Sequence, residues 1–68
     1  MFKMTRTHDS YKTLEQKFPK LRECQVYCSY ALYDNGVADK KTAQTVAAKL
    51  SPSNPVSHGG YTFTVEKL

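Results

Sequence analysis

The sequence predicts an α+β fold in which three short helices pack on a two-stranded β-ribbon formed by the N- and C-terminal strands, in the order β-α-α-α-β. Three observations support this fold class. Both ends of the chain alternate between apolar and polar residues, which is the period of a half-buried strand. The middle of the chain repeats its apolar residues every three or four positions, which is the period of a helix. The 68 residues are enough for one domain, residues 1–68, and for no more.

The alternation at the N-terminus covers residues 1–7. Phe2 and Met4 fall on one side of it, and Lys3 and Thr5 fall on the other. A lone strand is not stable in water, so we expect this strand to pair with the one at the other end of the chain. The pair would then bury its apolar side against the helices.

Residues 10–17 are predicted to form the first helix, since Tyr11, Leu14 and Phe18 follow one another at spacings of three and four. Pro19 then ends or kinks this helix, because a proline pushes the preceding residue out of the helical region. Two arrangements fit the sequence. We favour two helices that meet at an angle at the proline, and the alternative is one long bent helix.

Residues 21–33 are the longest helix-compatible run and are expected to lie at the centre of the fold. Cys24, Cys28 and Leu32 recur at helical spacing on one face, and a second face is apolar too. A helix that is apolar on most of its circumference normally has neighbours on both sides. The Asp-Asn-Gly sequence that follows can take the left-handed conformation that ends a helix. The second face consists of Val26, Tyr30 and Tyr33, with Tyr27 at its boundary.

A third helix is predicted over residues 39–50. Asp39 is positioned to cap it, and Ala43 and Ala47 begin an apolar stripe at helical spacing. The ten residues that follow contain two prolines and two glycines, and we expect them to form a loop. Residues 61–67 alternate again and are rich in aromatic and β-branched types, so they are predicted to form the second strand.

Ten Lys and Arg against six Asp and Glu give the chain a net charge of +4. This excess favours anionic partners such as nucleic acid or an acidic protein surface, and it argues against a protein that mimics DNA. Only two cysteines are present, and a bridge between residues one helical turn apart would add little stability. The cysteine usage is typical of reduced thiols. Together with the lack of a signal-like or membrane-spanning stretch, it predicts a cytoplasmic protein with no membrane partner.

The sequence contains no motif that would support catalysis or a cofactor. No serine, cysteine or histidine lies in a nucleophile motif, and Gly59 and Gly60 lack the spacing of a phosphate-binding loop. The two histidines lie singly and far from the cysteines, which matches no structural zinc pattern. We therefore expect a non-enzymatic protein without metal or cofactor, whose cysteines are small buried apolar residues.

Cationic and hydroxyl side chains gather on the third helix and in the loop behind it. We expect this set to contact duplex DNA, with lysines holding phosphates and hydroxyl groups approaching base edges. Two of the lysines open the helix, where free backbone amides suit a phosphate; the alternative is that both are solvated and offset by Asp39. The predicted nucleic-acid-binding residues are Lys40, Lys41, Thr42, Thr45, Lys49, Ser57 and His58.

The tyrosines of the central helix have three roles open to them. The first is in the core, with each hydroxyl reaching solvent. The second is a protein interface, either with a second copy of the chain or with a different protein, because tyrosine is enriched at interfaces. The third is stacking on the bases of single-stranded nucleic acid. The predicted interface residues are Tyr27, Tyr30 and Tyr33.

Residues 31–57 resemble the helix-turn-helix of small bacterial and phage regulators. A helix that ends in Ala-Leu, a loop with Asn-Gly and a second helix with Val-Ala before Leu follow one another in the order of that motif. The matching residues are Ala31, Leu32, Asn35, Gly36, Val46, Ala47, Leu50 and Ser51. A further stretch is similar to the opening of the recognition helix in LuxR-type domains, and it consists of Ser53, Asn54, Val56 and His58.

The resemblance implies a helix that reads the major groove. A helix begun at Pro55 would be stopped within a turn by Gly59 and Gly60. The helix that contacts the major groove would therefore be either a truncated helix in this stretch or the third helix itself, with the terminal strand acting as a wing.

These observations predict a small basic DNA-binding regulatory protein of phage, plasmid or bacterial accessory type. We expect a dimer, because one short helix contacts little DNA. The alternative is a small non-catalytic protein-binding module, such as a phage-type inhibitor or adaptor of a host protein. Such a module would use the tyrosine-rich face or the edge of the strand pair.

Overall fold

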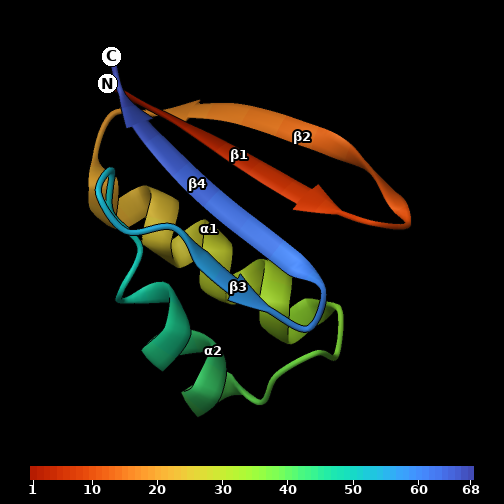
Figure 1. Ribbon diagram of the computed structural model, residues 1–68. Helices are drawn as coiled ribbons and strands as arrows, with labels where there is room; N and C mark the ends of the chain where they lie inside the picture. Colours follow the sequence, from red (N-terminus) through yellow and green to blue (C-terminus); the bar gives the residue numbers. More distant parts are fainter.

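The chain folds into one four-stranded antiparallel sheet with two helices on one side of it. The computed structural model describes residues 1–68. The elements are β1 (Phe2–His8), β2 (Tyr11–Phe18), α1 (Leu21–Asp34), α2 (Lys40–Ala47), β3 (Val56–His58) and β4 (Tyr61–Lys67). The strands are arranged in the order β2-β1-β4-β3, so the two terminal strands lie at the centre of the sheet (Figure 1).

The predicted pairing of the terminal strands is confirmed. β1 and β4 are antiparallel, and their register runs from Phe2 opposite Lys67 to His8 opposite Tyr61. The N- and C-termini therefore lie close together at one end of the sheet (Figure 1). Central placement gives both strands a hydrogen-bonded neighbour on each side, which the expected two-stranded ribbon would not.

The predicted architecture of three helices on a two-stranded ribbon is wrong. The structure is α+β, but it has four strands and two helices in the order β-β-α-α-β-β. Residues 10–17, predicted as the first helix, belong almost entirely to β2, and the predicted loop at 51–60 contains β3. Neither arrangement expected around Pro19 occurs, because this residue lies in the bend between β2 and α1.

The apolar spacing in β2 fits both a helix and a strand. Leu14 and Phe18 are four residues apart, an even spacing that also keeps both on one side of a strand. Tyr11 lies three residues before Leu14, and the sheet accommodates this odd step with an irregularity, because Arg6 pairs with Leu14 whereas His8 pairs with Tyr11. A two-residue turn after β1 sets β2 beside it, and this local hairpin decides the structure.

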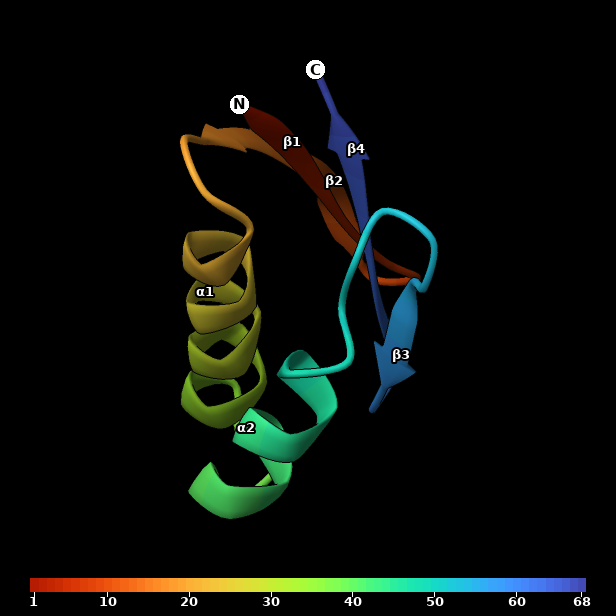
Figure 2. The same ribbon diagram turned by 90° about the vertical axis from the view of Figure 1, so that its left-hand side faces the viewer.

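The core lies between the helices and the side of the sheet that faces them (Figure 2). The predicted inner face of α1 is confirmed, since Cys24, Cys28 and Leu32 are all fully buried. Phe63 of β4 is the largest fully buried side chain and lies in the middle of the sheet. The complete core is Met4, Cys24, Cys28, Leu32, Ala43, Ala47, Leu50, Val56, Tyr61, Phe63 and Val65.

α2 begins as predicted, with Asp39 as its cap, but it ends at Ala47, before the predicted end at residue 50. The Thr42 backbone N–H donates to Asp39 Oδ1 at 2.7 Å, which satisfies one of the free amides of the first turn. Two small alanines form the buried side of α2 and let it approach α1 closely. The end of α2 is tied to α1, because Gln25 Nε2 donates to the Leu50 carbonyl oxygen at 3.0 Å.

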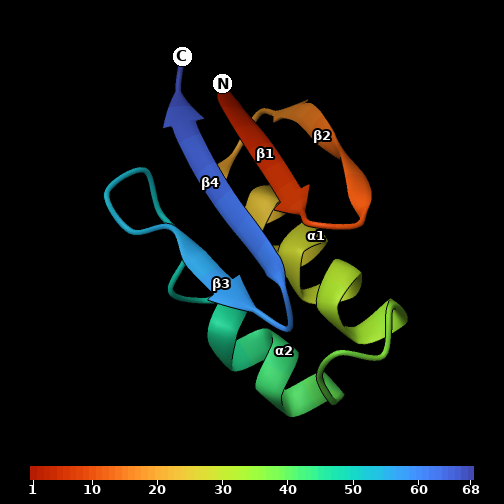
Figure 3. The ribbon, with the colours of Figure 1, turned by 45° about the vertical axis from the view of Figure 1, so that its right-hand side comes forward.

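Neither helix covers the other side of the sheet (Figure 3). The residues of β1 and β4 that point to this side are polar. Thr5 of β1 lies opposite Thr64 of β4 on this side. Lys3 and Glu15 form an ion pair across β1 and β2 at 3.7 Å. The sheet therefore has a buried apolar side and an open polar side, as expected for an antiparallel sheet in a small domain.

Candidate functional site

The predicted DNA-binding residues of α2 are all exposed, but they do not share one side of the helix. Lys41 and Thr45 are one turn apart, and the Thr45 hydroxyl donates to the Lys41 carbonyl oxygen at 2.9 Å. Lys49 follows four residues later, in the turn that ends the helix. At 3.6 residues per turn, this row lies opposite the buried alanines and faces solvent. We call Lys41, Thr45 and Lys49 the cationic line.

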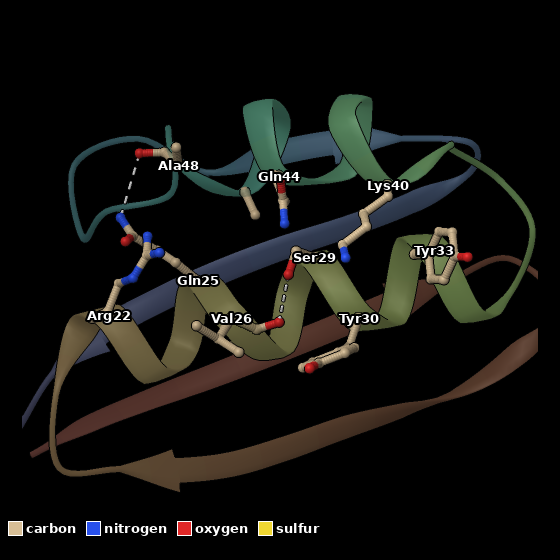
Figure 4. A pocket seen from close by; sticks show the side chains of 10 residues that line it. Arg22, Gln25, Val26, Ser29, Tyr30, Tyr33, Lys40, Gln44 and Ala48 are labelled. Carbon is tan, nitrogen blue, oxygen red and sulfur yellow. Dashed lines mark hydrogen bonds between the residues drawn. The ribbon is translucent and has the colours of Figure 1, made fainter.

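Lys40 lies outside the cationic line, and Thr42 lies beside it. Lys40 points toward α1 and lines a hollow between the helices together with Tyr30 and Tyr33 (Figure 4). Thr42 lies three residues before Thr45 and seven before Lys49, so helical periodicity places it beside the cationic line. Its backbone N–H donates to the Asp39 cap. The structure therefore separates Lys40 from the other predicted residues of this helix.

Ser57 and His58 lie in β3, at the edge of the sheet. Ser57 follows the buried Val56, so the alternation of the strand puts it on the open side of the sheet, away from the helices. Its Oγ atom lies 3.0 Å from Thr62 Oγ1. His58 is half-buried and lies opposite Tyr61. The structure therefore does not bring Ser57 into the cationic line.

The outward face of α1 has no neighbour, contrary to the expectation that this helix is covered on both sides. Tyr30 and Tyr33 are 61% and 50% exposed, and Val26 is 39% exposed. Tyr27 is half-buried, and its ring packs against that of Phe18 with the centroids 5.7 Å apart. The core role is therefore wrong for two of the three tyrosines.

The exposed apolar residues of α1 separate two hollows. Val26 and Tyr30 line both of them, so they form a ridge. The larger hollow has a volume of about 480 Å³ and lies between α1 and α2 (Figure 4). It is lined by Arg22, Gln25, Val26, Ser29, Tyr30, Tyr33, Lys40, Gln44, Ala47 and Ala48. The smaller hollow is almost entirely apolar and is lined by Phe18, Glu23, Val26, Tyr27 and Tyr30.

Sequence reasoning did not identify the charged ends of this ridge. Arg22, Val26, Tyr30 and Asp34 follow one another at spacings of four, and Arg22 and Asp34 are both exposed. The spacing of four places all four residues along one side of the helix. It could have identified Arg22 and Asp34 from the sequence alone. Neither Arg22 nor Asp34 forms an ion pair within the chain. The one ion pair in the structure joins β1 to β2.

The cationic line has no carboxylate on its own helix, because α2 contains no Asp or Glu. The nearest acid in the sequence is the cap, Asp39. The pKa of its carboxyl is lowered by the hydrogen bond from the Thr42 N–H, so the group is anionic at neutral pH. Its charge is directed at the first turn of α2, while the cationic line continues to the other end of the helix.

The two cysteines are buried, and their thiols stay protonated at neutral pH. Burial raises the pKa of the Cys28 thiol to about 12. The pKa of Cys24 is also raised, mainly by burial, with a smaller contribution from the neighbouring Glu23. A protonated thiol is a poor nucleophile and a poor metal ligand, and no group of three or more His, Cys, Asp and Glu side chains is arranged to hold a metal ion.

A second feature that the sequence did not predict is an aromatic cluster at the β1–β2 turn. The His8 ring lies 4.6 Å from that of Tyr11 and 4.4 Å from that of Tyr61. Arg6 lies over the Tyr61 ring at 5.9 Å and donates from Nη2 to the Lys12 carbonyl oxygen at 3.3 Å. These contacts hold the hairpin together, and they depend on a strand register that the sequence does not reveal.

Comparison of the chain with protein-family models, curated proteins and solved structures gives no match. Neither helix is long and apolar enough to span a membrane. The two helix surfaces are therefore the candidate functional sites of the chain.

Proposed function

We propose that the chain is a small DNA-binding regulatory protein, of phage, plasmid or bacterial accessory type, that places the cationic line of α2 against duplex DNA. The observation that carries the proposal is the row of Lys41, Thr45 and Lys49 on the solvent side of a helix without carboxylates. Lysine side chains in such a row can reach phosphates, which supply most of the affinity for DNA.

Thr45 would be the residue closest to the bases. Its hydroxyl proton is engaged by the Lys41 carbonyl oxygen, so toward a ligand the oxygen can only accept a hydrogen bond. In the major groove the amino groups of adenine and cytosine are the donors that fit an acceptor of this kind. The proposal therefore assigns positioning to the two lysines and base discrimination to the threonine.

The helix-turn-helix resemblance left two candidates for the helix that reads the major groove, and α2 is the one that we propose. Residues 53–58 form a turn and a strand, so no truncated helix is present there. α2 has eight residues and is about 12 Å long, which gives it access to only a few base pairs. β3 packs beside α2, so the β3–β4 hairpin is the natural wing of such a reader.

The proposal is tested by fluorescence anisotropy with labelled duplex DNA at about 50 mM and about 200 mM salt. We expect binding at low salt and a steep loss of affinity at high salt. The double variant Lys41→Glu with Lys49→Glu should lose affinity at least about tenfold, because two phosphate contacts become repulsive.

Lys17→Glu is the matched control, since it makes the same change per residue on β2, outside the helix layer. Lys17→Glu changes the net charge of each protomer as much as the single variant Lys41→Glu does, so the affinities of these two variants can be compared at equal charge. Absence of binding at low salt would refute the proposal. An equal loss of affinity for the control and for a single Lys41→Glu variant would show that only net charge matters.

The second candidate function is a non-catalytic protein-binding module, an inhibitor or adaptor of a host protein. The observation that favours it is the exposure of Val26, Tyr30 and Tyr33 on α1. A pull-down from nuclease-treated host extract separates the two functions. A stoichiometric protein that is retained after nuclease treatment, and lost with Tyr30→Ala, would support the module over the regulator.

A further inference from the structure

We propose that the outward face of α1 is a homodimer interface. In this dimer two α1 helices pack antiparallel across a two-fold axis, and Arg22 of each copy lies opposite Asp34 of the other. The inference stands on α1 alone and does not rest on the proposed DNA contact of α2.

The apolar part of the interface is already formed in the monomer. The ridge of Val26 and Tyr30 stands between two hollows, and Tyr33 extends the exposed aromatic surface toward the end of the helix. Helices associate by packing the ridge of one into the groove of the other. A second copy of the same surface supplies both a ridge and a hollow, so the ridge of each copy can pack into the hollow of the other.

The charges of α1 are arranged for an antiparallel partner. Arg22 lies in the first turn, and Asp34 is the last helical residue. Twelve residues separate them, which is about 18 Å along the axis, so they do not pair within one chain. Each charge also opposes the dipole of its own helix. An antiparallel copy reverses this situation, because it brings a carboxylate to the first turn and a guanidinium to the last.

One register satisfies the charged and apolar residues together. If the two-fold axis passes at the level of Cys28, Arg22 lies opposite Asp34 and Val26 lies opposite Tyr30 of the second copy. Glu23 then lies opposite Tyr33, which shares the larger hollow with the cationic Lys40. The residue numbers in each pair have the same sum, which is the requirement for an isologous contact between two antiparallel helices.

The size of the surface is compatible with a stable dimer. A standard interface buries about 800 Å² on each partner. The chain exposes 4398 Å² in total, so about a fifth of its surface would be covered. The outer face of α1, the hollow wall contributed by α2 and the end of β2 near Phe18 adjoin one another and make up the candidate area. The cationic line does not line either hollow and stays accessible.

A second copy explains more than an unrelated partner does. Any protein could cover exposed tyrosines, but opposite charges at the two ends of the same ridge make this face complementary to a copy of itself. The occupant that we infer is therefore a second copy, bound through the same face.

The test is sedimentation velocity across a range of protein concentrations, with circular dichroism to confirm folding. We expect the wild type to dimerise. Arg22→Asp and Asp34→Arg should each raise the dimer dissociation constant by at least about tenfold, because each change is repeated twice by symmetry and sets like charges opposite one another. The double variant with both changes restores opposite charges at both sites and should restore the dimer.

These variants distinguish a loss of dimerisation from a loss of monomer stability. Each single reversal removes a charge that opposes the helix dipole, so neither should unfold the monomer. A wild type that is monomeric at all concentrations would overturn the inference. So would a double variant that remains as dissociated as the singles, because the two positions would then not face each other. Loss of DNA binding with an intact dimer would leave this inference standing and refute only the proposed function.

Discussion

The two helices cover the same side of the sheet, yet their outward faces differ in chemistry. α1 presents Val26, Tyr30 and Tyr33 between charges of opposite sign, whereas α2 presents a cationic line without a carboxylate. An apolar ridge with self-complementary ends suits a protein surface, and a cationic row suits a polyanion. The two proposals therefore assign one binding task to each helix.

The largest expected effect comes from removing the shared support of both faces. Phe63 is fully buried at the centre of the sheet, and truncating a buried phenylalanine costs about 3–5 kcal/mol. That is comparable to the whole stability of a domain this small. Phe63→Ala should therefore unfold most of the chain in urea titrations. Thr64→Ala, its exposed neighbour, should change the free energy of unfolding by less than about 0.5 kcal/mol. Similar losses for both variants would contradict the assigned core.

A smaller loss of stability is expected from a substitution at Gly59, in the turn between β3 and β4. Gly59 has a φ of +59°, and a Cβ there would lie 2.7 Å from the Val37 Cβ in the segment that leads into α2. Gly59→Ala should cost about 1–3 kcal/mol in thermal or urea unfolding.

Gly36→Ala is the matched control for this turn. Gly36 also has a positive φ, of +72°, but open space surrounds it, so this variant incurs only the backbone strain. We expect it to be the more stable of the two variants. If Gly36→Ala were instead the less stable variant, the close contact between Gly59 and Val37 would be contradicted.

The buried side of α1 should make stability depend on alkaline pH. Folding raises the pKa of the Cys28 thiol to about 12 from its ordinary value of 9.0. Between these values the unfolded chain has lost the proton that the folded chain keeps, so the free energy of unfolding falls as pH rises. The slope approaches about 1.4 kcal/mol per pH unit for each such thiol. Cys28→Ala, compared with wild type from pH 8 to pH 10, should flatten this dependence. An unchanged slope would contradict the burial of the thiol.

The smallest expected effect on stability belongs to the exposed ridge. Tyr30→Ala removes a side chain that is 61% exposed, so urea unfolding at a concentration where the chain is monomeric should change by about 0.5 kcal/mol or less. The same variant should weaken self-association in sedimentation. A large loss of monomer stability would mean that Tyr30 belongs to the core and not to an interface.

The features that the sequence predicted correctly are those set by local spacing. The inner face of α1 follows from periodicity, and the Asp39 cap follows from a single residue type. The pairing of the terminal strands follows from their alternation together with the instability of a lone strand. The segment before Pro19 was assigned wrongly because a spacing of four residues satisfies a strand as well as a helix. The bulge that carries Tyr11 to the same side as Leu14 depends on pairing with β1, which no local pattern contains.

The candidate site was predictable only in part, for a different reason. An apolar pattern shows that Val26, Tyr30 and Tyr33 share a face, but it does not show whether another element covers that face. Likewise, the lysines and threonines of α2 were identified by composition, and only the orientation of the helix separates Lys41 and Lys49 from Lys40. Tertiary placement therefore decides which of the predicted residues can act together.

The most direct test of the cationic line is the salt dependence of duplex binding by wild type and by the double variant Lys41→Gln with Lys49→Gln. The slope of log affinity against log salt reports the number of phosphates that cations neutralise. We predict that the slope of the double variant is smaller by about two for each protomer bound. An unchanged slope would show that these lysines do not contact DNA and would contradict the account.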